Sequence, residues 1–159
     1  MRLVGHRDLV RSMELAFRRA GLRLGMSEGF HPKPRMSFPS ALAVGIEGLN
    51  EIMELELAEH DCPDAILRRL AQHALSGLTF RSVDFLPPGS RKAQLQSTAY
   101  QVPIPSHRRP EVNRRVARLL AQATCPINRP NRPAPVDLKR FLQEITLEDG
   151  LLAFRLASS

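Results

Sequence analysis

Two prolines in the stretch from Ser27 to Phe38 constrain the fold of this chain most strongly. Pro32 and Pro34 each fix their own φ angle and push the preceding residue toward extended geometry. The flanking segments are apolar and typical of strands, so the stretch is predicted to be a loop between two strands. The two prolines should make this loop stiff. Lys33 and Arg35 lie beside the prolines, and a stiff loop that presents cations loses little conformational entropy when it binds an anion. The alternative is an ordinary surface loop whose prolines only shape a crossing.

Apolar spacing on both sides of this stretch predicts the elements of the first half. A repeat at helical spacing indicates a helix from Leu9 to Ala20, with Asp8 as its N-cap and Gly21 as the residue that ends it. The element order is strand, helix, strand, strand, helix, strand, which is that of a ferredoxin-like unit. The further expected elements are a strand end at Met1–Val4, strands at Leu22–Met26, Glu51–Leu57 and Leu78–Leu86, a short irregular strand at Ala41–Ile46, and a helix that starts at Cys62-Pro63-Asp64 and stops at Gly77.

The run Pro87-Pro88-Gly89-Ser90 predicts a break between two units, residues 1–87 and 93–159. In the second half we expect a strand from about Leu95 to Ile104 and a helix that begins at Pro110. A hairpin should follow, with Asp149-Gly150 as its turn. The predicted fold class is therefore α+β, with two ferredoxin-like units that have antiparallel sheets and helices on one face. The second unit is incomplete, because its last helix and strand are missing.

Composition limits the classes of function. The formal net charge is +7, and nearly all of the positive charge is arginine. Two alternative explanations of this excess are a surface that binds an acidic partner and the coding bias of a GC-rich genome. Aromatic residues make up only 5% of the chain and tryptophan is absent, so base stacking is poorly provided for and any RNA binding would be mainly to phosphates.

Cysteine usage and hydropathy predict a cytoplasmic protein. Cys62 and Cys125 are isolated, so the sequence predicts neither a zinc nor an iron–sulfur site. Two lone cysteines fit a reducing compartment. No apolar run is long enough for a membrane span and no signal peptide is evident, so we expect no membrane partner.

A candidate binding site combines the central stretch with the turn before the first helix. His6 and Asp8 flank Arg7 there, and a histidine beside an acid can act as a general base or a metal ligand. A capping aspartate beside a structural histidine is the commoner explanation. We expect one electropositive, concave site without an assigned catalytic residue or metal. Its candidate binding residues are His6, Asp8, Ser27, Gly29, Phe30, His31, Lys33 and Arg35.

Three sequence motifs in the first half resemble the radical SAM-associated (radical SAM-linked) family, a domain of unknown function. They are His6-Arg7-Asp8-Leu9, Arg18-Arg19-Ala20-Gly21-Leu22 and Ser27-Glu28-Gly29-Phe30-His31-Pro32-Lys33-Pro34. Relative to that family, the chain is expected to begin within a strand and to stop before the last elements.

The resemblance implies an accessory or substrate-presenting domain for a cobalamin-binding radical SAM enzyme. It implies that the iron–sulfur cluster, S-adenosylmethionine and cobalamin belong to the partner and not to this chain. The alternative is a nucleic-acid module that binds RNA through phosphate contacts. A third hypothesis is an enzyme that uses His6, Asp8 and His31.

Overall fold

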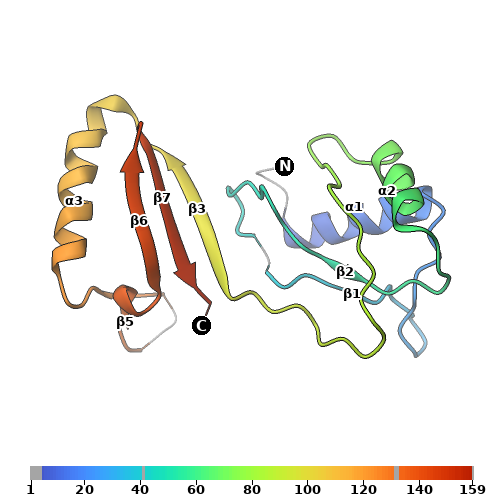
Figure 1. Ribbon diagram of the computed structural model, residues 1–159. Coiled ribbons are helices and arrows are strands. Elements are labelled where there is room, and N and C mark those ends of the chain that lie inside the picture. The colour runs from blue at the N-terminus through green and yellow to red at the C-terminus, as the bar shows by residue number, and fades with distance from the viewer. Residues whose placement is uncertain (1–4, 41, 131–132, 159) are drawn as a thin grey trace. The chain divides into compact units, whose positions relative to one another are not determined.

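A computed structural model describes residues 5–40, 42–130 and 133–158. The predicted strand end at Met1–Val4 lies outside the described residues. The chain divides into two compact units, Met1–Gln94 (unit 1) and Leu95–Ser159 (unit 2). The fold is mixed α+β with antiparallel sheets, and the described residues contain three α-helices (Figure 1).

Helix α1 (His6–Arg19) contributes one apolar face to the core of unit 1. Its apolar face repeats at helical spacing, and Met13, Ala16 and Phe17 on that face are buried. The predicted helix is confirmed, but its start is not: Gly5 occupies the N-cap and Asp8 lies within the first turn. The carboxylate of Asp8 therefore stabilises the positive end of the helix dipole without capping a backbone N–H group.

The end of α1 follows the sequence prediction. Gly21 has a φ of +67°, a left-handed conformation that glycine adopts without a steric penalty. The N–H of Gly21 donates to the carbonyl of Arg18 at 3.1 Å, and the N–H of Leu22 donates to that of Phe17 at 3.0 Å. This pair of bonds is a Schellman motif, and it turns the chain back over the buried face of the helix.

Helix α2 (Pro63–Gln72) contributes Ile66 and Leu70 to the same core. Pro63 stands in its first turn, as predicted, where a missing N–H costs nothing. The helix ends at Gln72, before the predicted stop at Gly77. The buried core cluster joins the two helices, and its members are Met13, Phe17, Ala20, Leu22, Ile66 and Leu70.

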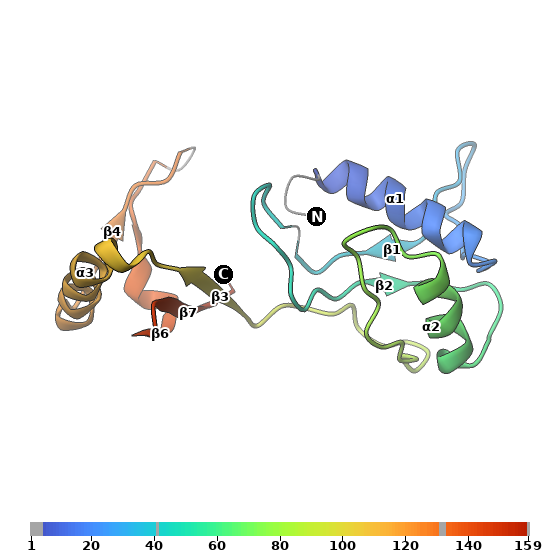
Figure 2. The same cartoon turned by 90° about the horizontal axis from the view of Figure 1, so that it is seen from above.

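The sheet of unit 1 is smaller than a ferredoxin-like unit requires. Strand β1 (Met36–Ser37) pairs antiparallel with β2 (Glu54–Leu55), and the segments around them join only through the isolated bridges Leu24↔Leu57 and Met26↔Pro34 (Figure 2). The Leu22–Met26 segment therefore forms two bridges and no continuous strand. Residues 42–46 and 78–86 contain no strand at all. The predicted strands fail there because a strand needs a partner at the right distance, and apolar patterning does not supply one.

Unit 2 is a three-stranded antiparallel sheet with one long helix. The sheet order is β3-β7-β6, and β7 runs antiparallel to both neighbours. Asp149 (φ 51°) and Gly150 (φ 80°) form the turn between β6 and β7, which confirms the predicted hairpin. The elements of unit 2 are β3 (Ser97–Pro103), η1 (Ser106–Arg108), α3 (Arg109–Ala121), β4 (Pro126–Ile127), β5 (Val136–Asp137), η2 (Leu138–Arg140), β6 (Leu142–Glu148) and β7 (Leu151–Ala157).

Burial differs between the units. Every buried hydrophobic side chain in the described part of the chain belongs to unit 1. No described apolar side chain of unit 2 is fully buried, and Tyr100 stacks on Phe154 across the β3–β7 pair with ring centroids 5.0 Å apart. No helix within the described residues is long and apolar enough to cross a membrane.

Candidate functional site

Three backbone segments of unit 1 meet at a closed ring of hydrogen bonds. The N–H of Gly25 donates to the carbonyl of Glu56 at 2.8 Å, the N–H of Glu56 to that of Arg35 at 2.9 Å, and the N–H of Arg35 to that of Gly25 at 2.8 Å. We call these three residues the junction. Because each residue both donates and accepts, no segment can shift without breaking a bond, and the chain on either side is fixed.

The junction leaves no space for a side chain at Gly25. A Cβ atom there would lie 2.8 Å from Cγ of Glu56, closer than van der Waals contact allows. On the exposed side, Nη1 of Arg35 lies 3.3 Å from both carboxylate oxygens of Glu56. Arg35 therefore fastens the junction, and part of the positive charge predicted for a binding site is neutralised locally.

Beyond the junction the chain forms a short protruding loop. Met26 forms an antiparallel bridge with Pro34, the N–H of Ser27 donates to the carbonyl of Lys33 at 2.8 Å, and the N–H of Lys33 donates to Oγ of Ser27 at 3.0 Å. Residues 27–33, which we call the tip loop, are thus closed at their base. Ser27 closes the base through its two hydrogen bonds with Lys33, and Pro32 and Pro34 restrict the φ angles of the returning chain.

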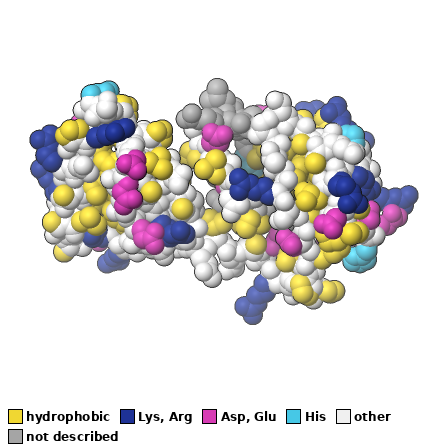
Figure 3. Space-filling view, turned by 45° about the horizontal axis from the view of Figure 1, so that its top comes forward, with side chains coloured by type: hydrophobic (Ala, Val, Ile, Leu, Met, Phe, Trp, Pro, Cys, Tyr) yellow, Lys and Arg dark blue, Asp and Glu magenta, His cyan; other side chains and the backbone are white. Residues whose placement is uncertain are grey.

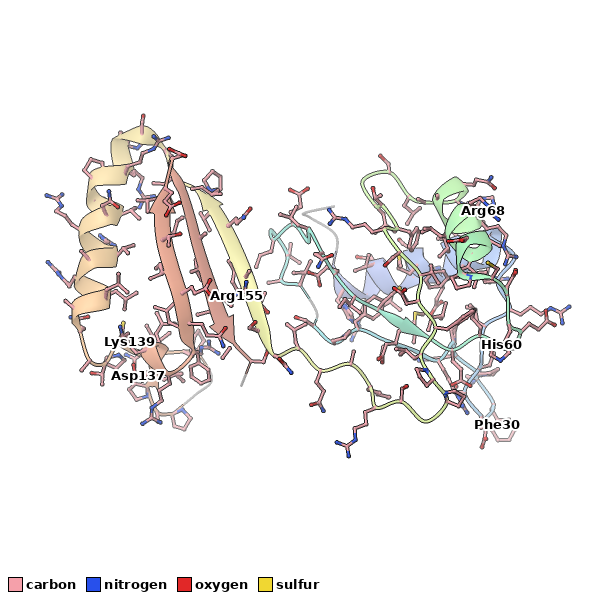
Figure 4. The ribbon with its side chains drawn as sticks, in the orientation of Figure 1. Phe30, His60, Arg68, Asp137, Lys139 and Arg155 are labelled. Carbon is pink, nitrogen blue, oxygen red and sulfur yellow. The ribbon has the colours of Figure 1, made fainter. Side chains whose placement is uncertain are left out.

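At the end of the tip loop an aromatic side chain is fully exposed to solvent. Gly29 has a φ of +113°, which only glycine adopts readily, and a Cβ atom added there would have no atom within 4 Å. Phe30 follows with a relative exposure of 102%, so its ring contacts no other part of the chain (Figure 4). His31 and Lys33 are exposed beside it.

The structure does not bring the predicted turn and the tip loop together. His6 is the first residue of α1, and its ring packs edge-on to Phe38 with centroids 5.4 Å apart. The tip loop projects on the side of unit 1 where α1 ends (Figures 1 and 2). The predicted loop from Ser27 to Phe38 is therefore partly sheet: it contains β1 and runs from the tip loop to His6. Asp8 lies in the first turn of α1 and has no part in the tip loop.

Two residues of the site were missed by sequence reasoning. Gly25 carried a usable signal, because a glycine inside a strand pattern often marks close approach by another backbone. Glu56 carried none, since the pattern around it indicated only a strand with one wet face. Its role depends on a contact with Arg35, which lies 21 residues away in the sequence.

A small polar hollow lies beside the end of α1. Its volume is about 60 Å³, and ion pairs of Arg23 with Glu59 (2.8 Å) and of Arg69 with Asp61 lie along it. The charges lining it are therefore already paired. Within the ranges that the structure describes, no three His, Cys, Asp or Glu side chains are grouped so that they could hold a metal ion.

One carboxyl group in unit 2 has a shifted pKa. The N–H of Cys125 donates to Oδ1 of Asp137 at 2.7 Å, and this bond is the main reason that the pKa of Asp137 lies below its ordinary value. The N–H of Lys139 donates to the same oxygen at 3.1 Å, and the charges of Arg140 and Lys139 act in the same direction. Partial desolvation opposes them. Asp137 thus ties the start of β4 to η2 and has a structural role.

Comparison with protein families decides where this chain belongs. The family model DUF2344, described as "Uncharacterized protein conserved in bacteria", matches residues 1–158. The chain belongs to this family. No curated protein and no solved structure matches the DUF2344 chain. The family description states no activity, so the relation to radical SAM enzymes stays a prediction.

Proposed function

We propose that this DUF2344 chain is a non-catalytic accessory domain that docks on a radical SAM enzyme through its tip loop. The observation that carries the proposal is the complete exposure of Phe30 on a loop that is fixed at its base. A phenylalanine in this position contributes nothing to the packing of its own unit. It is well suited to fill a pocket on another molecule.

The energetics favour such a contact. Full burial of a phenylalanine side chain stabilises a complex by about 1.5–3 kcal/mol. The junction and the two hydrogen bonds between Ser27 and Lys33 already order the tip loop, so little conformational entropy is lost on binding. His31 and Lys33 are exposed polar residues of the same loop, and an interface typically combines an apolar centre with a polar rim.

The identity of the partner rests on the resemblance to the radical SAM-associated family. In this proposal the partner holds the iron–sulfur cluster, S-adenosylmethionine and cobalamin, and carries out the radical chemistry. This chain supplies a docking element and acts either as an accessory domain or as a domain that presents the substrate to the enzyme. Such a pair would operate in the cytoplasm, where isolated cysteines such as Cys62 and Cys125 stay reduced.

We further infer that unit 2 corresponds to the first part of a ferredoxin-like unit. The supporting observation is the strand order β3-β7-β6, in which α3 connects two outer strands and the third strand runs antiparallel between them. The proposed docking through Phe30 of the tip loop in unit 1 does not depend on this inference about unit 2.

The test uses the full chain and the radical SAM enzyme encoded in the same genome. Binding is measured by isothermal titration calorimetry for the wild type and for Phe30→Ala. Loss of the ring should weaken binding by about 10- to 100-fold. It should change the free energy of unfolding by less than about 0.5 kcal/mol, because the side chain makes no contacts in its own unit.

Leu49→Ala is the matched control, since Leu49 is an exposed aliphatic residue (61%) outside the tip loop. The control should bind like the wild type. Equal binding by Phe30→Ala would refute docking through the tip loop. Failure of the wild type to bind any radical SAM enzyme of that genome would refute the choice of partner.

A further inference from the structure

The outer face of α3 carries a row of arginines that the tip loop does not explain. Arg114, Arg115 and Arg118 are exposed and lie with Glu111 around a shallow hollow of about 360 Å³. We call these three arginines the α3 arginine face. Their spacing from Glu111 is three, four and seven residues, so helical geometry puts all of them on one side. Lys and Arg side chains gather along the α3 side of unit 2 (Figure 3).

Charge is concentrated in this unit. Residues 95–159 contain ten Lys and Arg against five Asp and Glu, so five of the seven excess positive charges fall in unit 2. Several of these cations have structural partners. Nζ of Lys139 donates to the carbonyls of Leu119 and Leu120, Nε of Arg109 donates to that of Ile104, and Arg155 pairs with Glu144.

The α3 arginine face is different. Among the described residues, the side chains of Arg114 and Arg118 make no hydrogen bond and no ion pair, and the side chain of Arg115 pairs only with Glu111 one turn earlier. Lys139 holds the end of the helix that carries them. The helix is thus anchored while its outward guanidinium groups remain available to a ligand.

We propose that the α3 arginine face binds the phosphate backbone of an RNA strand. Guanidinium groups pair with phosphate oxygens in a bidentate manner. Arg114 and Arg118 are one helical turn apart, about 5–6 Å along the axis, which is comparable with the separation of neighbouring phosphates in one strand. The face holds no aromatic side chain, so it contacts the backbone and reads no sequence.

The chemistry of α3 disfavours two other occupants. A helix that lies on a membrane inserts its apolar side, but here Val112 and Val116 on that side are half-buried within unit 2. An interface with a folded protein gains most of its energy from side chains in well-packed, desolvated pockets, and the α3 arginine face offers only exposed charged groups. This proposal is independent of the docking role of Phe30.

The test measures binding of the full chain to a single-stranded RNA of about 20 nucleotides and mixed sequence, a length that exceeds the site of one small domain. Fluorescence anisotropy is recorded at several salt concentrations. Three phosphate contacts predict a slope of about −2 for log affinity against log salt. Affinity should therefore fall about 20-fold between roughly 50 and 200 mM salt.

The triple variant Arg114→Gln, Arg115→Gln, Arg118→Gln should lose most of this binding and of the salt slope. The matched control carries the same change at Arg11, Arg68 and Arg81, which are exposed residues of unit 1. It removes the same charge, so a general effect of net charge would weaken both variants equally. Glu111→Gln should tighten binding, because it releases Arg115 from its ion pair.

Three results would overturn the proposal. They are the absence of RNA binding by the wild type at about 50 mM salt, equal RNA binding by the triple variant and its control, and binding to phosphatidylserine vesicles in preference to RNA. Circular dichroism and the fluorescence of Tyr100 verify folding. Tyr100 is the single tyrosine of a chain without tryptophan, so its signal reports on unit 2 alone.

Discussion

Replacing Gly25 with alanine tests whether the junction holds unit 1 together. The added Cβ would lie 2.8 Å from Cγ of Glu56 and 3.0 Å from its Cβ and Cδ, whereas carbon atoms prefer about 3.5–4.0 Å. The Cγ and Cδ atoms can rotate away, but Cβ of Glu56 moves only with its backbone. The two segments must therefore separate by several tenths of an ångström, which strains the hydrogen bonds of the ring.

The magnitude follows from two opposing effects. Overpacking of a closely packed site costs about 1–3 kcal/mol. The φ of Gly25 lies outside the left-handed region, so alanine also restricts the unfolded chain and returns about 0.4–1 kcal/mol. The expected net loss in the free energy of unfolding is about 0.5–2 kcal/mol, measured by denaturant unfolding with far-UV circular dichroism.

A double-mutant cycle isolates the contact. In a Glu56→Gly background Cβ, Cγ and Cδ are all absent, so Gly25→Ala should cost at least about 0.5 kcal/mol less than in the wild type, a coupling typical of residues in contact. Equal costs in the two backgrounds, or stabilisation by Gly25→Ala alone, would show that Glu56 does not limit the space at Gly25. Close packing of Gly25 against Glu56 at the junction would then be refuted.

Three further predictions concern the core, the loop charges and pH. Phe17→Ala should lower the free energy of unfolding of unit 1 by about 3–5 kcal/mol and Leu70→Ala by about 2–5 kcal/mol, because both side chains are buried. Losses below about 1 kcal/mol for both variants would mean that these helix faces do not form the core. The double variant Lys33→Ala, Arg35→Ala should change thermal stability little, since the exposed ion pair of Arg35 with Glu56 contributes about 0–1 kcal/mol. It should weaken capture of the partner. Normal capture would exclude these two charges from the interface. Asp137→Ala should destabilise unit 2 at neutral pH, as followed by tyrosine fluorescence. Since the folded-state pKa of Asp137 lies below its ordinary value, its stabilisation is present above the unfolded-state pKa and is lost as the pH falls through the folded-state pKa. The difference from the wild type should shrink over that acidic range, and a difference independent of pH would contradict the role assigned to the carboxylate.

Much of the helical structure is evident from the amino-acid sequence. Four sequence signals each determine the structure of only a few neighbouring residues: the apolar repeat around Phe17, the stop at Gly21, the proline that begins α2 and the turn at Asp149-Gly150. A helix closes its hydrogen bonds between residues four apart, and a two-residue hairpin turn sets its own register. Local sequence therefore suffices to locate these elements to within a few residues.

The site itself depended on tertiary structure. Sequence patterning indicated which face of each extended segment is apolar, but not which segments pair. It therefore predicted a strand at Leu78–Leu86, where none forms, and missed β1 inside the proline-rich stretch. Gly25, Arg35 and Glu56 become one structural unit only because distant segments exchange backbone hydrogen bonds. Pairing of this kind is set by the global packing of the two helices on the sheet, and no local pattern encodes it.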